Sequence, residues 1–206
     1  MTKKRSNLLW LLGLVVLLAL AGWTAWRFWP HRFVGTIIQS PQPAYDFELM
    51  SVNGPVQLSD FRGKWVLLFF GYTYCPDVCP TTLADLARVM DLLGPRAKDL
   101  QVIMISVDPE RDTPERMAEY VSYFHPSFIG LTGTPEQIRE VATQYGVYYY
   151  RHEGTPETGY LVDHSAFTVL INPEGYLKVI FPPTFGPEGI TPEQMAEDLK
   201  YLISRE

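Results

Sequence analysis

Apolar runs of strand length occur at residues 65–70, 102–107 and 167–171, and the last two each contain one small polar residue, Ser106 or Thr168. A short run of this kind is typical of a strand that is buried on both faces, as in the middle of a parallel sheet. The segment 176–181 follows the last run after the turn-forming sequence Asn-Pro-Glu-Gly. These two segments are therefore predicted to form a β-hairpin.

Amphipathic helical patterns lie between these runs. Apolar residues recur at the i, i+3, i+4, i+7 spacing that places them on one face of a helix. The stripes consist of Leu83, Leu86, Ala87 and Met90; of Met117, Tyr120, Val121 and Phe124; of Ile138, Val141, Ala142 and Tyr145; and of Met195, Leu199 and Leu202. A short strand is expected at 128–131. The alternation of strands and helices predicts an α/β fold with a mostly parallel sheet, covered by helices on both faces.

A second β-hairpin is predicted ahead of the first buried run. Residues 46–50 and 56–58 have the character of two short strands, and Asn53-Gly54-Pro55 lies between them. Asn-Gly between strand segments is a strong turn signal. The expected fold therefore begins with a β-hairpin.

The tripeptide Thr-Pro-Glu occurs four times, beginning at Thr113, Thr134, Thr155 and Thr191. The copies at Thr134 and Thr191 continue with Gln, which gives a capping box with Pro at the first helical position. The copy at Thr155 precedes no apolar stripe and is assigned to a loop. The recurrence therefore indicates helix-cap chemistry rather than an internal duplication.

The N-terminus has the pattern of a membrane anchor. The basic residues 3–5 precede an uncharged stretch at 6–26, and a hydrocarbon core needs about 20 apolar helical residues. Trp23, Trp26 and Trp29 cluster at the far end, as is typical where a helix leaves a bilayer. The alternative is a cleavable signal peptide, because Ala19-Leu20-Ala21 resembles a processing site. An anchor is favoured, since the apolar, aromatic stretch continues past that site.

The chain is therefore divided into an anchor at residues 1–29, a Pro- and Gly-containing tether at 30–43 and one folded domain at 44–206. The positive charges before the span predict that the domain lies on the extracytoplasmic side. A bacterial inner membrane is favoured over a mitochondrial one, because no Arg- and Ser-rich transit sequence precedes the span.

The charge distribution excludes one class of partner. The net charge is −6, but from residue 33 onward there are 12 Lys and Arg against 23 Asp and Glu. An acidic domain without a basic stripe argues against nucleic-acid binding. It suits a partner with a basic surface or simply confers solubility.

The chain has two cysteines, Cys75 and Cys79, in a segment that joins the first buried run to the first long helix. Ligands usually bind at this edge of a parallel sheet. Pro80 is expected to open the main helix, so that Cys79 lies at a helix N-terminus, where the dipole favours a thiolate. The pair therefore indicates a reactive dithiol or a soft-metal site.

A third metal ligand has four histidine candidates. His31, His125 and His152 are each most simply solvated surface residues. His164 stands just before the buried run 167–171, and its loop is placed to reach the cysteines if that strand lies beside the first one. Spacing alone does not choose between a ligand and a structural histidine.

Three segments resemble the SCO/SenC family of copper-binding assembly factors for cytochrome oxidase. They are residues 71–80, 107–114 and 162–165, in the order that the family has them, and the similarity extends over about 47–203. The resemblance implies a thioredoxin-like three-layer fold and copper held by Cys75, Cys79 and His164. Family members often carry an aspartate where this chain has Ser106, a departure that involves no ligand position.

The chemistry of these residues suits the implied metal. Two sulfurs and one imidazole favour three-coordinate Cu(I), and Cu(II) is accommodated when a fourth ligand or water joins. Asp163 and Asp108 are expected to accept the imidazole N–H and orient the ring. For Asp108, turn formation is an equally good interpretation.

The function implied by the resemblance is that of a copper metallochaperone rather than an enzyme. Its partner would be the binuclear copper site of cytochrome c oxidase subunit II. The alternative is a membrane-anchored thiol–disulfide oxidoreductase that acts on the cysteines of that site, although thioredoxin-type enzymes have two intervening residues and no histidine ligand. A peroxidase of the peroxiredoxin type ranks last, because the second cysteine and the histidine have no evident purpose there.

Overall fold

The computed structural model describes residues 10, 14–24, 31–155, 159–184 and 189–205. The chain divides into two compact units, Met1–Arg32 and Phe33–Glu206. In the first unit residues 14–24 are helical. Within the described residues no helix has the length and apolar character to cross a membrane. Part of the predicted span at 6–26 lies outside those residues.

The second unit is built on a six-stranded sheet. In spatial order its strands are β1 (Thr36–Pro43), β10 (Tyr176–Phe181), β9 (Thr168–Ile171), β4 (Trp65–Gly71), β5 (Leu100–Ser106) and β6 (Ile129–Leu131). The predicted buried strands and the β9–β10 hairpin are confirmed. The prediction of a mostly parallel sheet is wrong: β4, β5 and β6 are parallel, whereas β9, β10 and β1 pair antiparallel. An apolar run indicates burial on both faces, but it does not indicate strand direction.

The segment 30–43, predicted to be a tether, contributes a strand to this sheet. Residues 36–43 form β1, which pairs with β10 in the register Thr36 to Ile180. Just before β1, the backbone N–H groups of Val34 and Gly35 donate hydrogen bonds to the buried Asp198 carboxylate at 2.9 and 3.3 Å. Pro43 at the end of β1 fits an edge strand, where a missing N–H costs no ladder bond.

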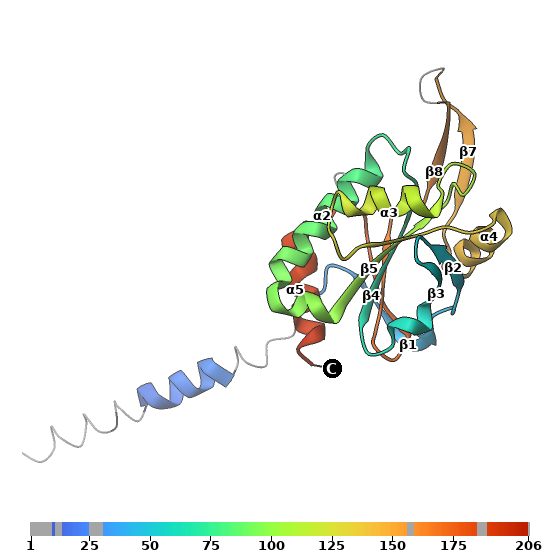
Figure 1. Cartoon of the computed structure of the whole chain (residues 1–206). Coiled ribbons are helices and arrows are strands. Elements are labelled where there is room, and N and C mark those ends of the chain that lie inside the picture. Colours follow the sequence, from blue (N-terminus) through green and yellow to red (C-terminus); the bar gives the residue numbers. More distant parts are fainter. Residues whose placement is uncertain (1–9, 11–13, 25–30, 156–158, 185–188, 206) are drawn as a thin grey trace, which may run out of the picture. The chain divides into compact units, whose positions relative to one another are not determined.

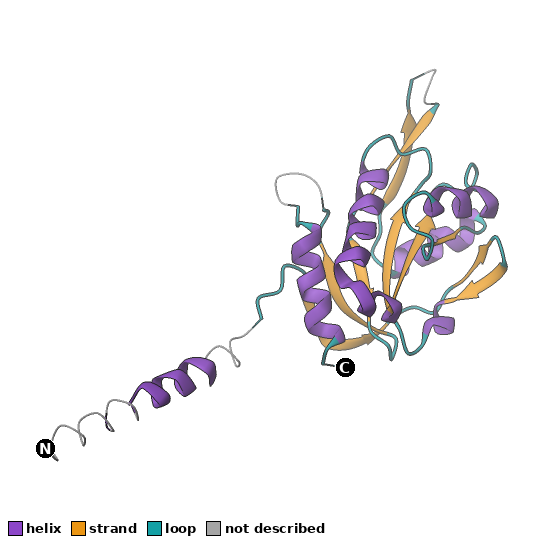
Figure 2. Cartoon of the chain, turned by 60° about the vertical axis from the view of Figure 1, so that its left-hand side comes forward, coloured by secondary structure: helices purple, strands orange, loops and turns teal. Residues whose placement is uncertain are grey.

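Among the described residues of this unit, four α-helices cover the sheet. They are α2 (Val78–Leu93), α3 (Pro114–Ser122), α4 (Pro135–Gln144) and α5 (Pro192–Ile203). Short 3₁₀ helices occur at Leu58–Phe61 and Gly94–Asp99. The helices α2 and α5 pack side by side, and α4 lies on the other side of the sheet (Figures 1 and 2). Successive residues of β4 face these two layers in turn: Phe70 contacts Tyr145 after α4, at 5.9 Å between ring centroids, whereas Gly71 faces Cys79 of α2. The expected three-layer arrangement is present.

The Thr-Pro-Glu-Gln motifs at Thr134 and Thr191 act as helix caps, as predicted. The Thr134 and Thr191 side chains accept hydrogen bonds from the N–H of the Gln three residues on, and both capping boxes are complete. Thr113 caps α3 in the same way, although it lacks the Gln. Local sequence therefore sets where these helices begin.

The described part of the chain has two further hairpins outside the main sheet. The predicted N-terminal one is β2 (Glu48–Ser51) with β3 (Gly54–Gln57). The other, β7 (Tyr149–Glu153) with β8 (Tyr160–His164), was not predicted. Figure 1 shows β7 and β8 running together away from the sheet. Apart from Leu161 and Val162 their residues are polar or Tyr, and most are half-buried or exposed, so they give no long apolar run to detect.

Candidate metal centre

The two cysteines lie where β4 passes into α2. β4 ends at Gly71 and α2 begins at Val78, two residues before the predicted start at Pro80. Cys79 is in the first turn of the helix and fully buried, whereas Cys75 is half-buried in the preceding loop. The Cys79 N–H points to the Cys75 sulfur at 3.4 Å. Sequence reasoning thus placed Cys79 correctly at a helix N-terminus.

A glycine at the end of β4 makes room for the buried sulfur. A Cβ added at Gly71 would lie 2.9 Å from Cys79 Sγ and 2.8 Å from the ring of Phe69. Real Cβ atoms essentially never approach other atoms so closely. Only glycine therefore allows α2 and its first turn to pack this tightly on β4.

His164 is the last residue of β8 and faces the cysteines. Its Nε2 lies 3.3 Å from Cys79 Sγ, and its Nδ1 lies 3.0 Å from the Ser165 carbonyl oxygen. A carbonyl only accepts hydrogen bonds, so Nδ1 is assigned the proton, which leaves the Nε2 lone pair directed at the sulfur. Phe69 and Tyr72 hold the ring edge-on, at centroid distances of 6.2 and 6.0 Å.

The structure brings together the three side chains that the sequence singled out. The possible ligand atoms of Cys75, Cys79 and His164 all lie within 4.8 Å of one another, and they form the one such group of His, Cys, Asp and Glu found among the described residues. Two other histidines lie elsewhere: His125 contacts Ser127, and His152 contacts the carboxylate of Asp163. A hollow of about 390 Å³ opens beside Cys75 and His164.

The two sulfurs differ in charge state. The hydrogen bond from the Cys79 side chain, together with backbone N–H groups at Asp77 and Cys79, outweighs burial and lowers the pKa of Cys75 to about 4. The pKa of Cys79 is raised well above its usual value, first by the hydrogen bond to Cys75 and then by burial. The thiolate expected on Cys79 is therefore on Cys75 in the metal-free protein, because Cys75 receives the donors.

The prediction that Asp163 and Asp108 accept the N–H of the His164 imidazole is wrong. Asp163 is exposed and contacts His152, and Asp108 forms an ion pair with Arg111 and accepts a hydrogen bond from the Tyr160 hydroxyl. A backbone carbonyl takes their place: the Nδ1 of His164 donates a hydrogen bond to the carbonyl oxygen of the next residue, Ser165. Side-chain identities in the sequence carry no signal for such a bond.

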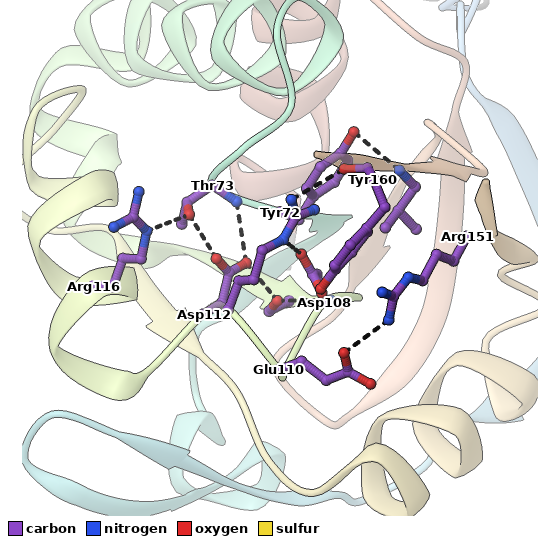
Figure 3. Close-up of polar contacts among 11 residues, drawn as sticks. Tyr72, Thr73, Asp108, Glu110, Asp112, Arg116, Arg151 and Tyr160 are labelled. Atoms are coloured by element: carbon purple, nitrogen blue, oxygen red, sulfur yellow. Dashed lines mark hydrogen bonds and ion pairs between the residues drawn. The ribbon is translucent and has the colours of Figure 1, made fainter. Parts of the chain in front are cut away.

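The sequence did not indicate the role of Asp112. Asp112 is fully buried and accepts hydrogen bonds from the N–H and hydroxyl of Thr73 at 3.1 and 2.6 Å and from the Ser106 hydroxyl at 2.6 Å (Figure 3). Burial raises the pKa of this carboxyl. Asp112 thereby anchors the loop that carries Cys75.

Comparison with solved structures assigns the fold to a class. Apo Sco1 of Thermus thermophilus has a TM-score of 0.74 and 46% identity, over 84% of this chain and 98% of that one. The structure of Arabidopsis thaliana ScoI with copper bound has a TM-score of 0.72 and 36% identity, over 80% of this chain and 100% of that one. The fold is therefore the thioredoxin-like α/β fold of Sco proteins.

Sequence comparison gives the family. The SCO1/SenC family profile matches residues 36–204. A SCO2-like protein of Rickettsia conorii is 40% identical over 75% of this chain and 74% of its own length. The mitochondrial SCO2 homologue of Bos taurus is 44% identical over 71% of this chain, but this chain covers only 56% of its length. The chain belongs to the SCO1/SenC family, as the sequence resemblance indicated.

Proposed function

We propose that this protein is a copper metallochaperone that binds the metal through Cys75, Cys79 and His164. The observation that carries the proposal is the convergence of two sulfurs and one imidazole nitrogen within 4.8 Å. Soft sulfur ligands with an imidazole suit copper in its Cu(I) state. Three relatives, from Arabidopsis thaliana, Bradyrhizobium japonicum and yeast, have solved structures with copper bound.

The donor groups fit this metal. Cys75 already carries a thiolate in the metal-free protein, and the Nε2 of His164 has its lone pair free for a ligand. Cys79 has to release its proton on binding, so metal uptake is coupled to deprotonation. When bound, copper would supply an exchangeable, redox-active centre. The chain's own residues hold the three donors in place and shield the inner sulfur from water.

The proposed recipient is the binuclear copper site of cytochrome c oxidase subunit II, and Cu(II) is accommodated if a fourth ligand joins. The acidic character of residues 33–206 suits a recipient with a basic surface. The N-terminal segment is proposed as a single-pass anchor in the bacterial inner membrane, with residues 33–206 on the extracytoplasmic side. The protein would act as a carrier and not as an enzyme.

A second candidate function is thiol–disulfide exchange with the cysteines of the recipient. The half-buried Cys75, with a pKa of about 4, favours it, because thiolates are the attacking species. His164 separates the two functions. A chaperone needs the imidazole for metal binding, whereas thiolate attack needs no third ligand.

The test compares His164→Ala with His152→Ala in the reduced protein. We expect His164→Ala to lose the nitrogen ligand in X-ray absorption and to fail in transfer of Cu(I) to an apo subunit II domain, while its cysteines still exchange with a disulfide. His152→Ala, which removes a half-buried histidine on the same hairpin that contacts Asp163 rather than the cysteines, should transfer copper normally. Full copper transfer by His164→Ala would favour the exchange function instead.

A further inference from the structure

The site draws its ligands from two parts of the fold that share no strand pairing. The cysteines belong to the main sheet and α2, whereas His164 ends β8, which pairs only with β7 in a separate two-stranded sheet. A two-stranded hairpin is marginally stable by itself in water. Other contacts must therefore hold His164 against Cys79.

Those contacts lie on the edge of β8 that β7 does not occupy. Successive residues of a strand direct their backbone groups to opposite edges, so Tyr160 and Val162 present theirs to the same edge. The Val162 N–H donates to the Tyr72 hydroxyl at 3.2 Å, and the Tyr160 carbonyl accepts from Arg111 at 3.0 Å. Two side chains thus take the place of a third strand.

Arg111 makes most of this connection. Its guanidinium stacks on the Tyr160 ring at 3.6 Å and lies 4.5 Å from the ring of Tyr74, the residue before Cys75. Asp108 fixes the guanidinium through an ion pair of 2.5 Å and also binds the Tyr160 hydroxyl at 2.6 Å (Figure 3). The Arg111 side chain is only 17% exposed, so solvent screens these contacts weakly.

The stack continues on both sides of Arg111. The guanidinium of Arg116, in α3, lies 4.2 Å from the centroid of the Tyr74 ring. The guanidinium of Arg151, in β7, lies 3.5 Å from the centroid of the Tyr160 ring. Arginine and tyrosine therefore alternate from α3, across the cysteine loop, to the hairpin. Arg151 is held by Glu110 at 2.9 Å, and Arg116 by the Thr73 hydroxyl at 2.8 Å.

We propose that Arg111 is a positioning residue, which holds the histidine-bearing hairpin in register with the cysteine loop through its planar guanidinium. The proposal rests on the proposed copper site, because its consequence is the presence of His164 in the ligand set. A lysine at this position keeps the charge but neither stacks as a plane nor makes several bonds in a fixed geometry. The role therefore depends on shape as well as charge.

The first experiment uses the metal-free, reduced protein, so that its outcome does not depend on copper. In the wild type, NMR should show cross-peaks between the His164 and Tyr72 rings, whose centroids are 6.0 Å apart. We expect these to disappear in Arg111→Gln and in Arg111→Lys. They should remain in Arg88→Gln, which removes the exposed Arg88–Glu193 ion pair between α2 and α5. Retention of the cross-peaks in Arg111→Lys would overturn the proposal.

The second experiment titrates Cu(I) and counts ligands by X-ray absorption. Loss of the nitrogen ligand with both sulfurs kept is the expected result for the Arg111 variants, with affinity reduced about 10- to 100-fold. A wild type that binds no copper would refute the proposed function, yet the ring contacts of the metal-free protein would still test the positioning role. Normal nitrogen ligation in both Arg111 variants would refute the positioning role alone.

A matched pair at Tyr160 covers the case in which the Arg111 variants do not fold. Tyr160→Phe keeps the ring face and loses only the bond to Asp108, whereas Tyr160→Leu removes the ring on which Arg111 stacks. We expect the nitrogen ligand to persist in Tyr160→Phe and to be lost in Tyr160→Leu. Equal nitrogen ligation in the two variants would contradict the stacking role.

Discussion

Replacement of Gly71 by alanine tests whether tight packing of α2 on β4 sets the position of the buried sulfur. The added Cβ would meet Cys79 Sγ at 2.9 Å, the Phe69 ring at 2.8 Å and Met104 Cε at 3.1 Å. Ordinary contact begins at 3.4 Å, so the sulfur has to retreat by about 0.5 Å. Its neighbours in the core are fully buried and cannot absorb this movement freely.

The expected cost follows from this overlap. Overpacking of a buried site destabilises a protein by about 1–3 kcal/mol. For a domain of this size the melting temperature should fall by about 2–12 °C. Because a ligand atom is displaced, we also expect Cu(I) affinity to fall at least about tenfold. Thermal unfolding by circular dichroism and competitive Cu(I) titration measure the two effects.

Gly130→Ala is the matched control. Its Cβ would lie 2.7 Å from the backbone oxygen of Met117, where α3 packs on β6, and the three nearest atoms all belong to Met117 rather than to a candidate ligand. This variant should lose stability and keep its copper affinity. The reasoning is refuted if Gly71→Ala has the wild-type melting temperature and affinity, or if Gly130→Ala weakens copper binding as much as Gly71→Ala does.

Two more predictions follow from the sulfur environment and from the first strand. Iodoacetamide should label Cys75 in preference to the buried Cys79, and peptide mass spectrometry identifies the labelled cysteine. The labelling rate should stay level from pH 8 to about pH 5 and fall only as the pH approaches the Cys75 pKa of about 4. Preferential labelling of Cys79, or a rate that already declines just below pH 8, would contradict the assignment of the thiolate to Cys75. A chain that begins at Phe33 should unfold cooperatively, whereas one that begins at Ala44 lacks β1, leaves β10 uncovered and should melt at a lower temperature. Equal melting temperatures would contradict the structural role of β1.

The core of the fold could be predicted from sequence because its signals are strong and local. The apolar runs that became β4, β5 and β9 have fully or almost fully buried residues, and the Thr-Pro-Glu-Gln boxes mark the starts of α4 and α5. Burial and capping depend on residue type within a few positions. Strand direction does not, so the sheet was wrongly expected to be mostly parallel.

The segments that were missed take their structure from distant partners. Residues 36–43 contain two prolines and little apolar periodicity, yet they form β1 because β10 offers an open edge. The hairpin of β7 and β8 is held by Arg111 and Tyr72, which lie far away in the sequence. No local pattern reports such contacts.

The candidate ligands themselves were predictable, but their environment was not. The spacing of Cys75 and Cys79 indicated a dithiol or metal site, and the family resemblance singled out His164. The orienting carbonyl of Ser165 depends on backbone geometry, and the thiolate on Cys75 depends first on the hydrogen bond from the Cys79 side chain. A sequence motif names the reacting groups without stating which of them carries the charge.

The pairing of β1 with β10 has a consequence for the order in which the protein is made. β1 is the first strand of the sheet to be synthesised, but its partner strand β10 ends only at Phe181. The Val34 N–H, just before β1, donates its hydrogen bond to Asp198, which lies 164 positions further on. Contacts between such distant segments form late, because a long loop must close first. The edge of β10 thus stays open to other chains until the N-terminal segment returns to cover it. The strand β1 is therefore synthesised before the rest of the sheet, but it takes its place in the sheet at the end of folding.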